Sequence, residues 1–403
     1  MASDHKMKIS RVIAFGLIAC ALYGFGAGIR SNIGILLNPV AAHSGLSYDS
    51  VSICIAFMQL FFGLSQPVFG IVASRKSNRF VLLLGILFLG LSMIGMMIST
   101  SFVMLFISLG IVFGLGAGAI AFGLVLSSAI RFVGQENAMI ISGMLNAAAG
   151  MAGFILSPLM QTLIERYGLN VTFTVLIVIV AALIPVTLIV TGHDNENTVQ
   201  QTSTQKINAK DLFRKALSNR TYRLLIAGFT TCGFHMVIIE SHLFSQFVLF
   251  GIDENKASWA FSIYGIATIL GALLSGFFSS KLNKGKMLGF YYGFRAIWVI
   301  IYIFLIPKNL FTAVIFSIGL GMTGDATVSP TSGLVSENFE IGEVATLIGF
   351  LFFCHQIGAF LSAWLGGVIR TATGNYTNLW IIDILLCIFA SVMSFRIAET
   401  RKN

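Results

Sequence analysis

Long apolar segments separated by short polar loops run through the whole chain. A helix needs about 20 mostly apolar residues to cross a bilayer, and twelve segments of this kind are present. They lie at 12–37, 50–73, 80–98, 102–128, 138–160, 170–191, 221–248, 257–280, 286–306, 310–335, 344–370 and 377–396. The pattern predicts an all-α membrane protein with twelve transmembrane helices.

One long polar stretch divides these segments into two sets of six. Residues 192–220 are rich in Thr, Gln and Ser and end in a short basic amphipathic segment, which is typical of a tether between two units. We therefore expect an N-terminal six-helix bundle over 1–191, a cytoplasmic linker over 192–220 and a C-terminal six-helix bundle over 221–403. The first apolar segment is longer than the core of a signal peptide, so we interpret it as an uncleaved helix.

The composition agrees with this interpretation and argues against most other classes of protein. Of the 403 residues, 56% are hydrophobic and 10% are charged, whereas soluble domains carry about 25% charged residues. A soluble, disordered or nucleic-acid-binding chain does not fit these values. The cysteines stand singly inside apolar segments, at Cys20, Cys54, Cys232, Cys354 and Cys387. This spacing lacks the pairs that mark disulfide and metal sites, and we expect neither a metal nor a cofactor.

The net charge of +9 becomes informative once the lysines and arginines are assigned to loops. With both termini in the cytoplasm, nineteen of the 25 lie in cytoplasmic segments, four lie outside, and Arg30 and Arg295 lie within spans. Cytoplasmic loops of membrane proteins carry an excess of Lys and Arg. The charge therefore predicts cytoplasmic termini and a multi-pass position in the inner cell membrane, and not a nucleic-acid partner.

Glycines recur between the two sets of helices at an offset of 206 residues. The matching pairs are Gly45 and Gly251, Gly70 and Gly276, Gly143 and Gly349, and Gly168 and Gly374. Each pair occupies the same place relative to the predicted helices. Two parallel repeats are typical of transporters that bind substrate at the interface between the repeats, near the membrane midplane.

The loop after the second predicted helix carries a family motif. Residues 70–79, Gly-Ile-Val-Ala-Ser-Arg-Lys-Ser-Asn-Arg, resemble the G-x-L-a-D-r-x-G-r-r signature of the major facilitator superfamily, with Ser74 for the Asp and Ser77 for the second Gly. The resemblance extends over the whole chain and implies a central cavity lined by helices 1, 4, 7 and 10. The glycine-proline signature that drug antiporters carry in helix 5 is absent from 143–153, which argues against a drug exporter.

Several stretches resemble bacterial relatives of the monocarboxylate transporters. They are 28–39, 45–47, 232–235, 241–243, 331–335 and 355–366. In that family a basic residue in the outer half of helix 1 meets the substrate carboxylate, and Arg30 is similarly placed. The Asp-x-x-x-Arg pair of helix 8 in the animal proteins is replaced by Ala267 and Gly271. A coupled proton would therefore use different groups.

Ionisable side chains inside membrane spans are costly and indicate functional sites. Eight are predicted there: Arg30, His235, Glu240, His242, Arg295, Asp325, His355 and Asp383. Arg30 is the first candidate for substrate binding, because a permanently charged guanidinium suits a planar carboxylate, and Tyr23 shares its helical face. The alternatives are an arginine that extends to the lipid headgroups or an ion pair with a neighbouring acid. A guanidinium turned toward lipid, or sealed in a dry pair, would remove the anion site. Asp383, on a peripheral helix, is expected to be structural.

His235 and Glu240 lie in the predicted seventh helix. His235 falls beside the position that corresponds to Arg30 in the second repeat, so we expect the two side chains to meet across the cavity. Its imidazole suits substrate binding or proton coupling, with hydrogen-bonded packing as the alternative. Glu240 lies about 140° around the helix from His235. We therefore expect it to point elsewhere, toward helix 8 or toward His355 of helix 11, and keep it as a proton-coupling candidate.

The remaining candidates lie in helices 5, 10 and 11. Asp325 is the best single candidate for a proton-coupling carboxylate, because it lies among small residues that leave room for a substrate. An ion pair with Arg295 is the alternative, since an unpaired buried charge is costly. Asn146, His355 and Gln356 are predicted to donate hydrogen bonds to a small anion, with bonding between helices as the alternative.

These observations predict a secondary active transporter that moves a small, monocarboxylate-like organic anion together with a proton by alternating access. Its partners are then the anion, the proton and the lipid bilayer. Export of an organic anion, siderophore or drug is one alternative, and a transporter-like sensor that binds without moving its ligand is another. The sequence has no HExxH or GxSxG motif and no carboxylate pair at a plausible spacing, so we expect no enzymatic activity.

Overall fold

The computed structural model describes residues 9–192 and 209–397, and every regular element within these ranges is helical. Eleven helical stretches there are long and apolar enough to cross a membrane. The longest of them bends at Gly168, where φ is +80°, and so supplies two crossings. The described residues therefore contain twelve crossings, and the predicted fold class is confirmed. Most of the expected linker, 193–208, lies outside the described residues.

The elements before residue 193 form the first six crossings. They are α1 (Ile9–Ser31), α2 (Ile33–Ser44), α3 (Tyr48–Arg75), α4 (Asn78–Met97), α5 (Phe102–Leu105), η1 (Phe106–Phe113), α6 (Gly114–Ala119), α7 (Phe122–Val133), η2 (Gln135–Asn137) and α8 (Ala138–Val190). The predicted span 12–37 is thus two helices, α1 and α2, joined at Asn32. The Asn32 side chain donates to the carbonyl oxygens of Gly28 and Gly153 at 2.8 and 3.2 Å, which holds the break against α8.

The elements after residue 208 form the other six crossings and one short helix. They are α9 (Ala209–Ser218), α10 (Arg220–Ile238), η3 (Ile239–Leu243), α11 (Phe244–Leu249), α12 (Glu254–Ser279), α13 (Lys284–Ile300), η4 (Ile301–Leu305), α14 (Leu310–Thr323), η5 (Asp325–Thr327), α15 (Val328–Asn338), α16 (Ile341–Thr373) and α17 (Thr377–Phe395). The elements η1, η3 and η4 are π-helical, a wider form that is frequent at functional sites.

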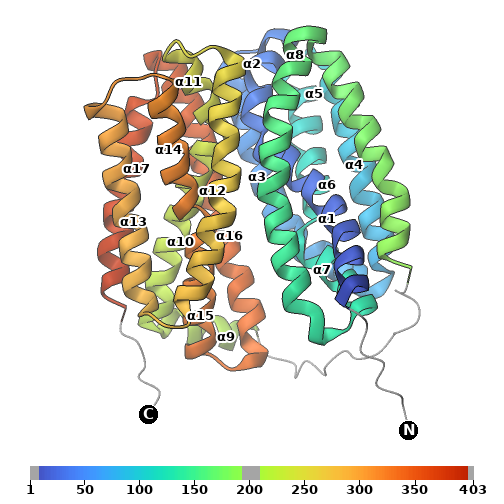
Figure 1. Cartoon of the computed structure of the whole chain (residues 1–403), viewed down its shortest axis with the longest axis vertical. Coiled ribbons are helices and arrows are strands. Elements are labelled where there is room, and N and C mark those ends of the chain that lie inside the picture. Colours follow the sequence, from blue (N-terminus) through green and yellow to red (C-terminus); the bar gives the residue numbers. More distant parts are fainter. Residues whose placement is uncertain (1–8, 193–208, 398–403) are drawn as a thin grey trace.

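The helices run along the long axis of the molecule in two groups that lie side by side. In Figure 1 the elements α1 to α8 form one group and α10 to α17 form the other. Four of the glycine positions that recur at the 206-residue offset also share a positive φ: it is +68° at Gly45, +80° at Gly251, +80° at Gly168 and +76° at Gly374. A left-handed φ is favourable for glycine because it lacks a Cβ. The repeat predicted from sequence is therefore present in the backbone.

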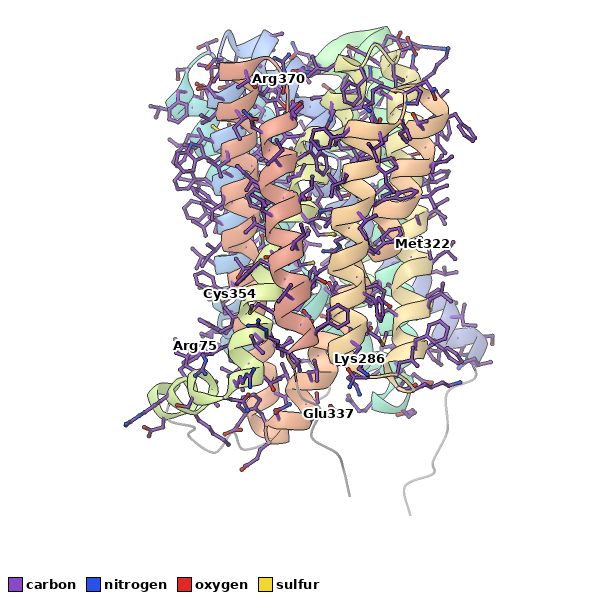
Figure 2. All side chains as sticks on the ribbon, turned by 90° about the vertical axis from the view of Figure 1, so that its left-hand side faces the viewer. Arg75, Lys286, Met322, Glu337, Cys354 and Arg370 are labelled. Atoms are coloured by element: carbon purple, nitrogen blue, oxygen red, sulfur yellow. The ribbon has the colours of Figure 1, made fainter. Side chains whose placement is uncertain are left out.

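The two ends of the molecule differ in charge. Arg75 and Lys286 lie at one end, together with Glu337, and Arg370 lies at the other (Figure 2). We call the first the basic end and the second the opposite end. At the basic end α9 packs through its buried Leu212 and Ala216, and Lys215 Nζ lies 2.8 Å from Glu343 Oε1. The hydrogen bond to Lys215 holds the pKa of the Glu343 carboxyl below its ordinary value.

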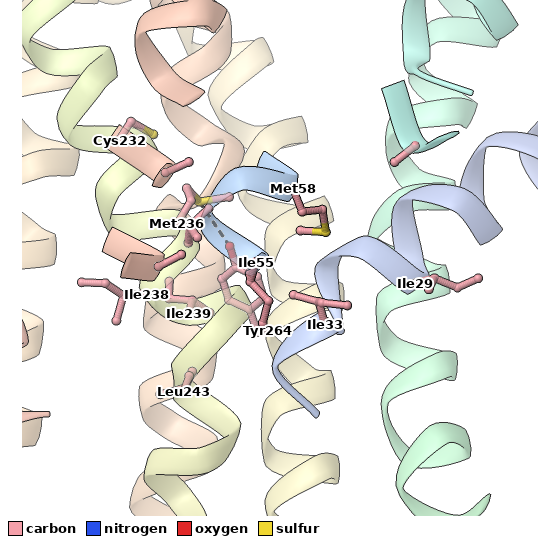
Figure 3. Packing of buried hydrophobic residues seen from close by; sticks show 14 of the residues in the cluster. Ile29, Ile33, Ile55, Met58, Cys232, Met236, Ile238, Ile239, Leu243 and Tyr264 are labelled. Atoms are coloured by element: carbon pink, nitrogen blue, oxygen red, sulfur yellow. Dashed lines mark hydrogen bonds between the residues drawn. The ribbon is translucent and has the colours of Figure 1, made fainter. Parts of the chain in front are cut away.

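The two groups of helices meet along α3 against α16 and α8 against α12. Small residues permit this close approach: a Cβ on Gly63 would lie 2.5 Å from the Gln356 side chain, and a Cβ on Gly150 would lie 2.6 Å from the carbonyl oxygen of Gly265. Buried apolar side chains of both groups join in one core, as Figure 3 illustrates for Ile33 and Tyr264 among others. In the absence of a hydrophobic force within lipid, such close contact is what holds membrane helices together.

Candidate functional site

An ion pair between Arg30 and Glu240 joins the two groups of helices. Arg30 Nη1 lies 2.8 Å from Glu240 Oε2, and Nη2 lies 3.1 Å from Oε1. Gln59 of α3 supports both partners: its Oε1 accepts from Arg30 at 2.9 Å and its Nε2 donates to Glu240 at 3.2 Å. The Arg30 guanidinium also lies over the Phe62 ring, 4.7 Å from the centroid. The three hydrogen bonds that the Glu240 carboxylate accepts here all come from the N-terminal group of helices.

Local backbone structure places these two side chains opposite each other. Arg30 ends α1, just before the break at Asn32. Glu240 lies in the π-helical η3, whose backbone approaches α2 so closely that a Cβ on Gly34 would lie 2.6 Å from the Glu240 carbonyl oxygen. Glycine at 34 therefore permits the contact that brings the carboxylate to Arg30.

The prediction of an unpaired Arg30 is wrong in this structure. The alternative from sequence, an ion pair with a neighbouring acid, is what the structure contains. The pair is not sealed, because the Arg30 side chain is 17% exposed and that of Glu240 is 8% exposed. The expectation that Glu240 points away from Arg30 is also wrong.

His235 does not face Arg30 and does not line the space between the groups. Its Nδ1 lies 2.8 Å from Asp383 Oδ2 of α17, and both side chains are fully buried. The residue of the seventh helix that lies opposite Arg30 is Glu240, and not His235 as predicted. The two side chains do point in different directions from this helix, as predicted, since His235 faces α17 while Glu240 faces α1. Asp383 has the structural environment that was predicted for it.

One group of side chains in the described residues has potential ligand atoms close enough, within 4.8 Å of one another, to hold a metal ion. It consists of His235, Asp383 and Cys387. Hydrogen bonds account for these contacts, because Cys387 Sγ also lies 3.8 Å from Asp383 Oδ1.

Asp325 lies at a break in the tenth crossing, and it does not pair with Arg295. Helix α14 ends at Thr323, the single turn η5 begins at Asp325, and α15 continues from Val328. Arg295 is fully buried and donates to the carbonyl oxygen of Gly324 at 2.8 Å and to that of Thr323. The guanidinium therefore caps the broken helix, and the predicted ion pair is absent from the described residues.

Asp325 faces the space between the two groups of helices. It is exposed, although it lies in the middle of a membrane-spanning segment. Its electrostatic neighbours are Glu240, His355, Arg30 and Arg295. Tyr23 of α1, in the other group, has Arg30, Asp325 and Glu240 among its neighbours. A side chain that interacts with α1 across the interface cannot be directed at lipid.

Among the other predicted site residues, His355 has Glu240, Arg30 and Asp325 as electrostatic neighbours. Asn146 is exposed and lies two helical turns before Gly153, whose carbonyl oxygen accepts from Asn32. His355 packs against Phe229, with ring centroids 5.1 Å apart. The buried atoms His355 Nδ1 and Gln356 Oε1 have no hydrogen-bond partner, so both retain unused capacity for a ligand. Figure 2 shows the neighbouring Cys354 between the two ends of the molecule.

Three residues of the site were missed by the sequence analysis. Gln59 and Phe62 hold the ion pair, and Tyr264 of α12 has Asp325 and Glu240 among its electrostatic neighbours. A buried glutamine inside an apolar span was the one available signal, since a polar group in lipid needs a partner.

A polar cluster closes the interface toward the opposite end. The Tyr48 hydroxyl of α3 lies 3.0 Å from His242 Nδ1 and is also hydrogen-bonded to the hydroxyl of Tyr376. His242 Nε2 lies 3.1 Å from the carbonyl oxygen of Ala363. Toward the basic end, by contrast, a partly open cavity of about 360 Å³ lies between α3 and α7, with Gln66 and Arg131 among its lining residues. The interface is thus closed at the opposite end, and the N-terminal half is hollowed toward the basic end.

Comparisons with known proteins agree with this architecture. The family model described as "Major Facilitator Superfamily" matches residues 16–249 and 243–403. The chain is 24% identical to an uncharacterized MFS-type transporter, YcxA, of Bacillus subtilis over 96% of this chain and 93% of that protein. It is 22% identical to human monocarboxylate transporter 12 over 82% of this chain and 69% of that protein.

A solved structure has the same fold. The crystal structure of a D-xylose-proton symporter matches with a TM-score of 0.73 at 12% identity, over 98% of this chain and 99% of the other. The family match covers nearly the whole sequence, and the twelve crossings, the repeat and the interface between the halves agree with it. The chain therefore belongs to the Major Facilitator Superfamily.

Proposed function

We propose that the protein is a secondary transporter that moves a small organic anion together with a proton by alternating access. The two bundles over 1–191 and 221–403 would rock about the site that contains Arg30 and Glu240, joined by the linker over 192–220. The positive-inside rule supports cytoplasmic termini, a basic end that faces the cytoplasm and a place in the inner cell membrane. The conformation described above is then open inward.

The ion pair between Arg30 and Glu240 is the observation that carries the proposal. A guanidinium binds a planar carboxylate through two parallel hydrogen bonds, and Glu240 occupies that position. A substrate carboxylate must therefore displace Glu240. A buried charge that loses its partner costs about 3–5 kcal/mol, so displacement is favourable only when Glu240 takes up a proton. The proton and the anion then bind together, which is the requirement for symport.

The neighbouring side chains suit the remainder of a small acid. Tyr23, Asn146, His355 and Gln356 have hydroxyl, amide or imidazole groups around the same space, and those of His355 and Gln356 have unused capacity. We assign them to substrate binding, as the sequence analysis did. We assign proton coupling to Glu240, whose protonation directly releases Arg30, and no longer to His235.

Transport by purified protein in proteoliposomes tests the proposal. The probe is the acid that most raises the melting temperature in a screen of propionate, lactate, pyruvate and benzoate, because ligands of the folded state stabilise it. Wild-type protein is expected to accumulate this acid under an inward proton gradient. Glu240→Gln, which is permanently neutral, should retain exchange of labelled for unlabelled acid but lose gradient-driven accumulation by about tenfold or more. Arg30→Ala should lose both.

Glu136→Gln is the matched control, because Glu136 is exposed in η2 and its carboxylate accepts from the adjacent Asn137 of the same half, and it should behave as wild type. Proton-driven accumulation by Glu240→Gln, or normal transport by Arg30→Ala, would overturn the proposal. The same vesicles separate the alternatives: a sensor binds the acid without exchange, and an exporter accumulates it only when the gradient is reversed.

A further inference from the structure

A second carboxylate near the ion pair, that of Asp325, lies at the break in the tenth crossing. Among the described residues, no Lys, Arg or His forms an ion pair with Asp325. The side chain is exposed at the helix break between α14 and α15. Its electrostatic neighbours are Glu240, His355, Arg30 and Arg295. The proposed binding space thus contains one exposed acid in addition to the pair.

Arg295 does not supply the missing counter-charge. Its guanidinium is fully buried and is directed at the carbonyl oxygens of Thr323 and Gly324, at the end of α14. Those carbonyls carry the negative end of the helix dipole, so the arginine neutralises the end of the helix. It also donates to Cys232 Sγ at 3.4 Å, on the side of the C-terminal bundle. The Nη1 and Nη2 groups of Arg295 thus donate within the C-terminal bundle, while its buried Nε has no hydrogen-bond partner.

From this arrangement we propose that the substrate is a zwitterion, an acid that carries both a carboxylate and an ammonium group. The inference rests on the proposed function, in which Arg30 receives the carboxylate. The ammonium group would lie beside Asp325, with the unpartnered His355 Nδ1 and Gln356 Oε1 next to it. Opposite charges at the two ends of the substrate would match opposite charges at the two ends of the site.

Charge balance supports this class over a plain carboxylate. If Asp325 is ionised when Glu240 is protonated and Arg30 binds a plain acid, it lies near a second negative charge in a medium of low dielectric constant, where like charges repel strongly. An ammonium group removes that repulsion and gives the Asp325 carboxylate a charged hydrogen-bond donor. One substrate molecule then satisfies both carboxylate-binding and ammonium-binding groups without an additional ion.

Matched acids that share a carbon skeleton test the inference. Purified protein is titrated with propionate, lactate and alanine, and then with 4-methylpentanoate, 2-hydroxy-4-methylpentanoate and leucine, and binding is followed by the rise in melting temperature. In each set the amino acid should bind wild-type protein about tenfold or more tightly than the plain acid, a difference of about 1.4 kcal/mol. The hydroxy acid, which offers a neutral donor, should fall between them.

Variants of Asp325 assign the preference to this side chain. Asp325→Asn should lose the preference for the amino acid and bind the plain acid at least as well as wild type, while Asp325→Glu, which retains the charge, should keep the preference. Asp49→Asn is the matched control, because Asp49 lies at the opposite end and contacts Thr371. It should leave the order of binding unchanged.

The outcomes separate the inference from the proposal beneath it. Equal or tighter binding of the plain acids, abolished by Arg30→Ala, would retain the anion site and overturn the zwitterion. A preference for the amino acids that survives in Asp325→Asn would also overturn it. If no member of either set raises the melting temperature, or if Arg30→Ala binds as wild type does, the anion site itself fails and the inference fails with it.

Discussion

Two buried acid–base pairs in the C-terminal half differ in their surroundings, and this difference determines their roles. Glu240 contacts Arg30 of the other half and is within reach of the exposed Asp325. The pair of His235 and Asp383 lies wholly between α10 and α17, and neither side chain is exposed. A group that moves protons needs access to water at some stage. The first pair has it, and the second pair lacks it.

We predict that the His235–Asp383 pair stabilises the fold and does not couple protons. Asp383→Ala leaves the imidazole buried without its partner, which costs about 1–3 kcal/mol, so the melting temperature should fall by several degrees. The pH dependence of transport by the surviving folded protein should match that of wild type. Differential scanning fluorimetry and uptake across a pH series measure the two effects.

A conservative double variant serves as the control for this prediction. His235→Gln with Asp383→Asn retains a neutral hydrogen bond between α10 and α17 and should recover part of the lost stability. A shifted pH profile in Asp383→Ala, with an unchanged melting temperature, would instead assign the pair to proton coupling.

Sequence reasoning identified the residue types of the site and misjudged which of them meet. Arg30, Asp325 and His355 do lie around one space. The partner of Arg30 was not predictable, because the segment Thr231–Phe247 is buried on every side and its polar residues therefore have no face that distinguishes cavity from core. Contacts with α1 and α17 determine the orientation of Glu240 and His235, and such long-range contacts are not encoded in the local pattern.

At the scale of elements, helix-to-helix distance in this protein depends on where glycines face a neighbouring backbone. Helix α16 shows both situations. A Cβ on Gly358 would overlap the Thr230 carbonyl oxygen of α10, whereas Gly349 has nothing within 4 Å. The same residue type on the same helix is therefore a packing requirement at one position and not at the other.

We predict opposite effects for alanine at these two positions. Gly358→Ala should separate α10 from α16 and lower stability by about 1–3 kcal/mol, the usual cost of overpacking. Gly349→Ala should be neutral or stabilising by up to about 1 kcal/mol, because alanine favours helix over glycine. The melting temperatures of the two variants in one detergent measure the difference. Equal effects would show that α10 can yield to the added methyl group.

The helical spans were predictable to within a few residues, and the interruptions within them were not. Apolar length determines a crossing, so each predicted segment overlaps an observed one. The break at Asn32, the π-helical turn at Glu240 and the turn at Asp325 arise where side chains of other helices satisfy the freed backbone groups, as Arg295 does for Gly324. These interruptions carry the site, so the sequence predicts the scaffold better than it predicts the chemistry.

For the whole molecule, the polar cluster at the opposite end is the counterpart of the cavity at the basic end. Tyr48 belongs to the N-terminal half, and its hydroxyl bonds to His242 and Tyr376 of the C-terminal half. Alternating access requires that these bonds break when that end opens. We therefore predict that Tyr48→Phe shifts the population toward the state open at the opposite end.

The two hydrogen bonds lost in Tyr48→Phe determine the expected size of this shift. Each hydrogen bond contributes about 0.5–1.5 kcal/mol net to the stability of the closed state. A free-energy change of about 1.4 kcal/mol corresponds to a tenfold change in an equilibrium constant. The population of the state open at the opposite end should therefore rise by about tenfold. Spin labels on Tyr167→Cys and Thr373→Cys, both exposed at that end, report the separation of the halves. Tyr291→Phe is the control, since this half-buried tyrosine of α13 lies within one half. An unchanged distance distribution in Tyr48→Phe would show that the other contacts between the halves, among them the close packing at Gly34 and Gly367, hold that end shut.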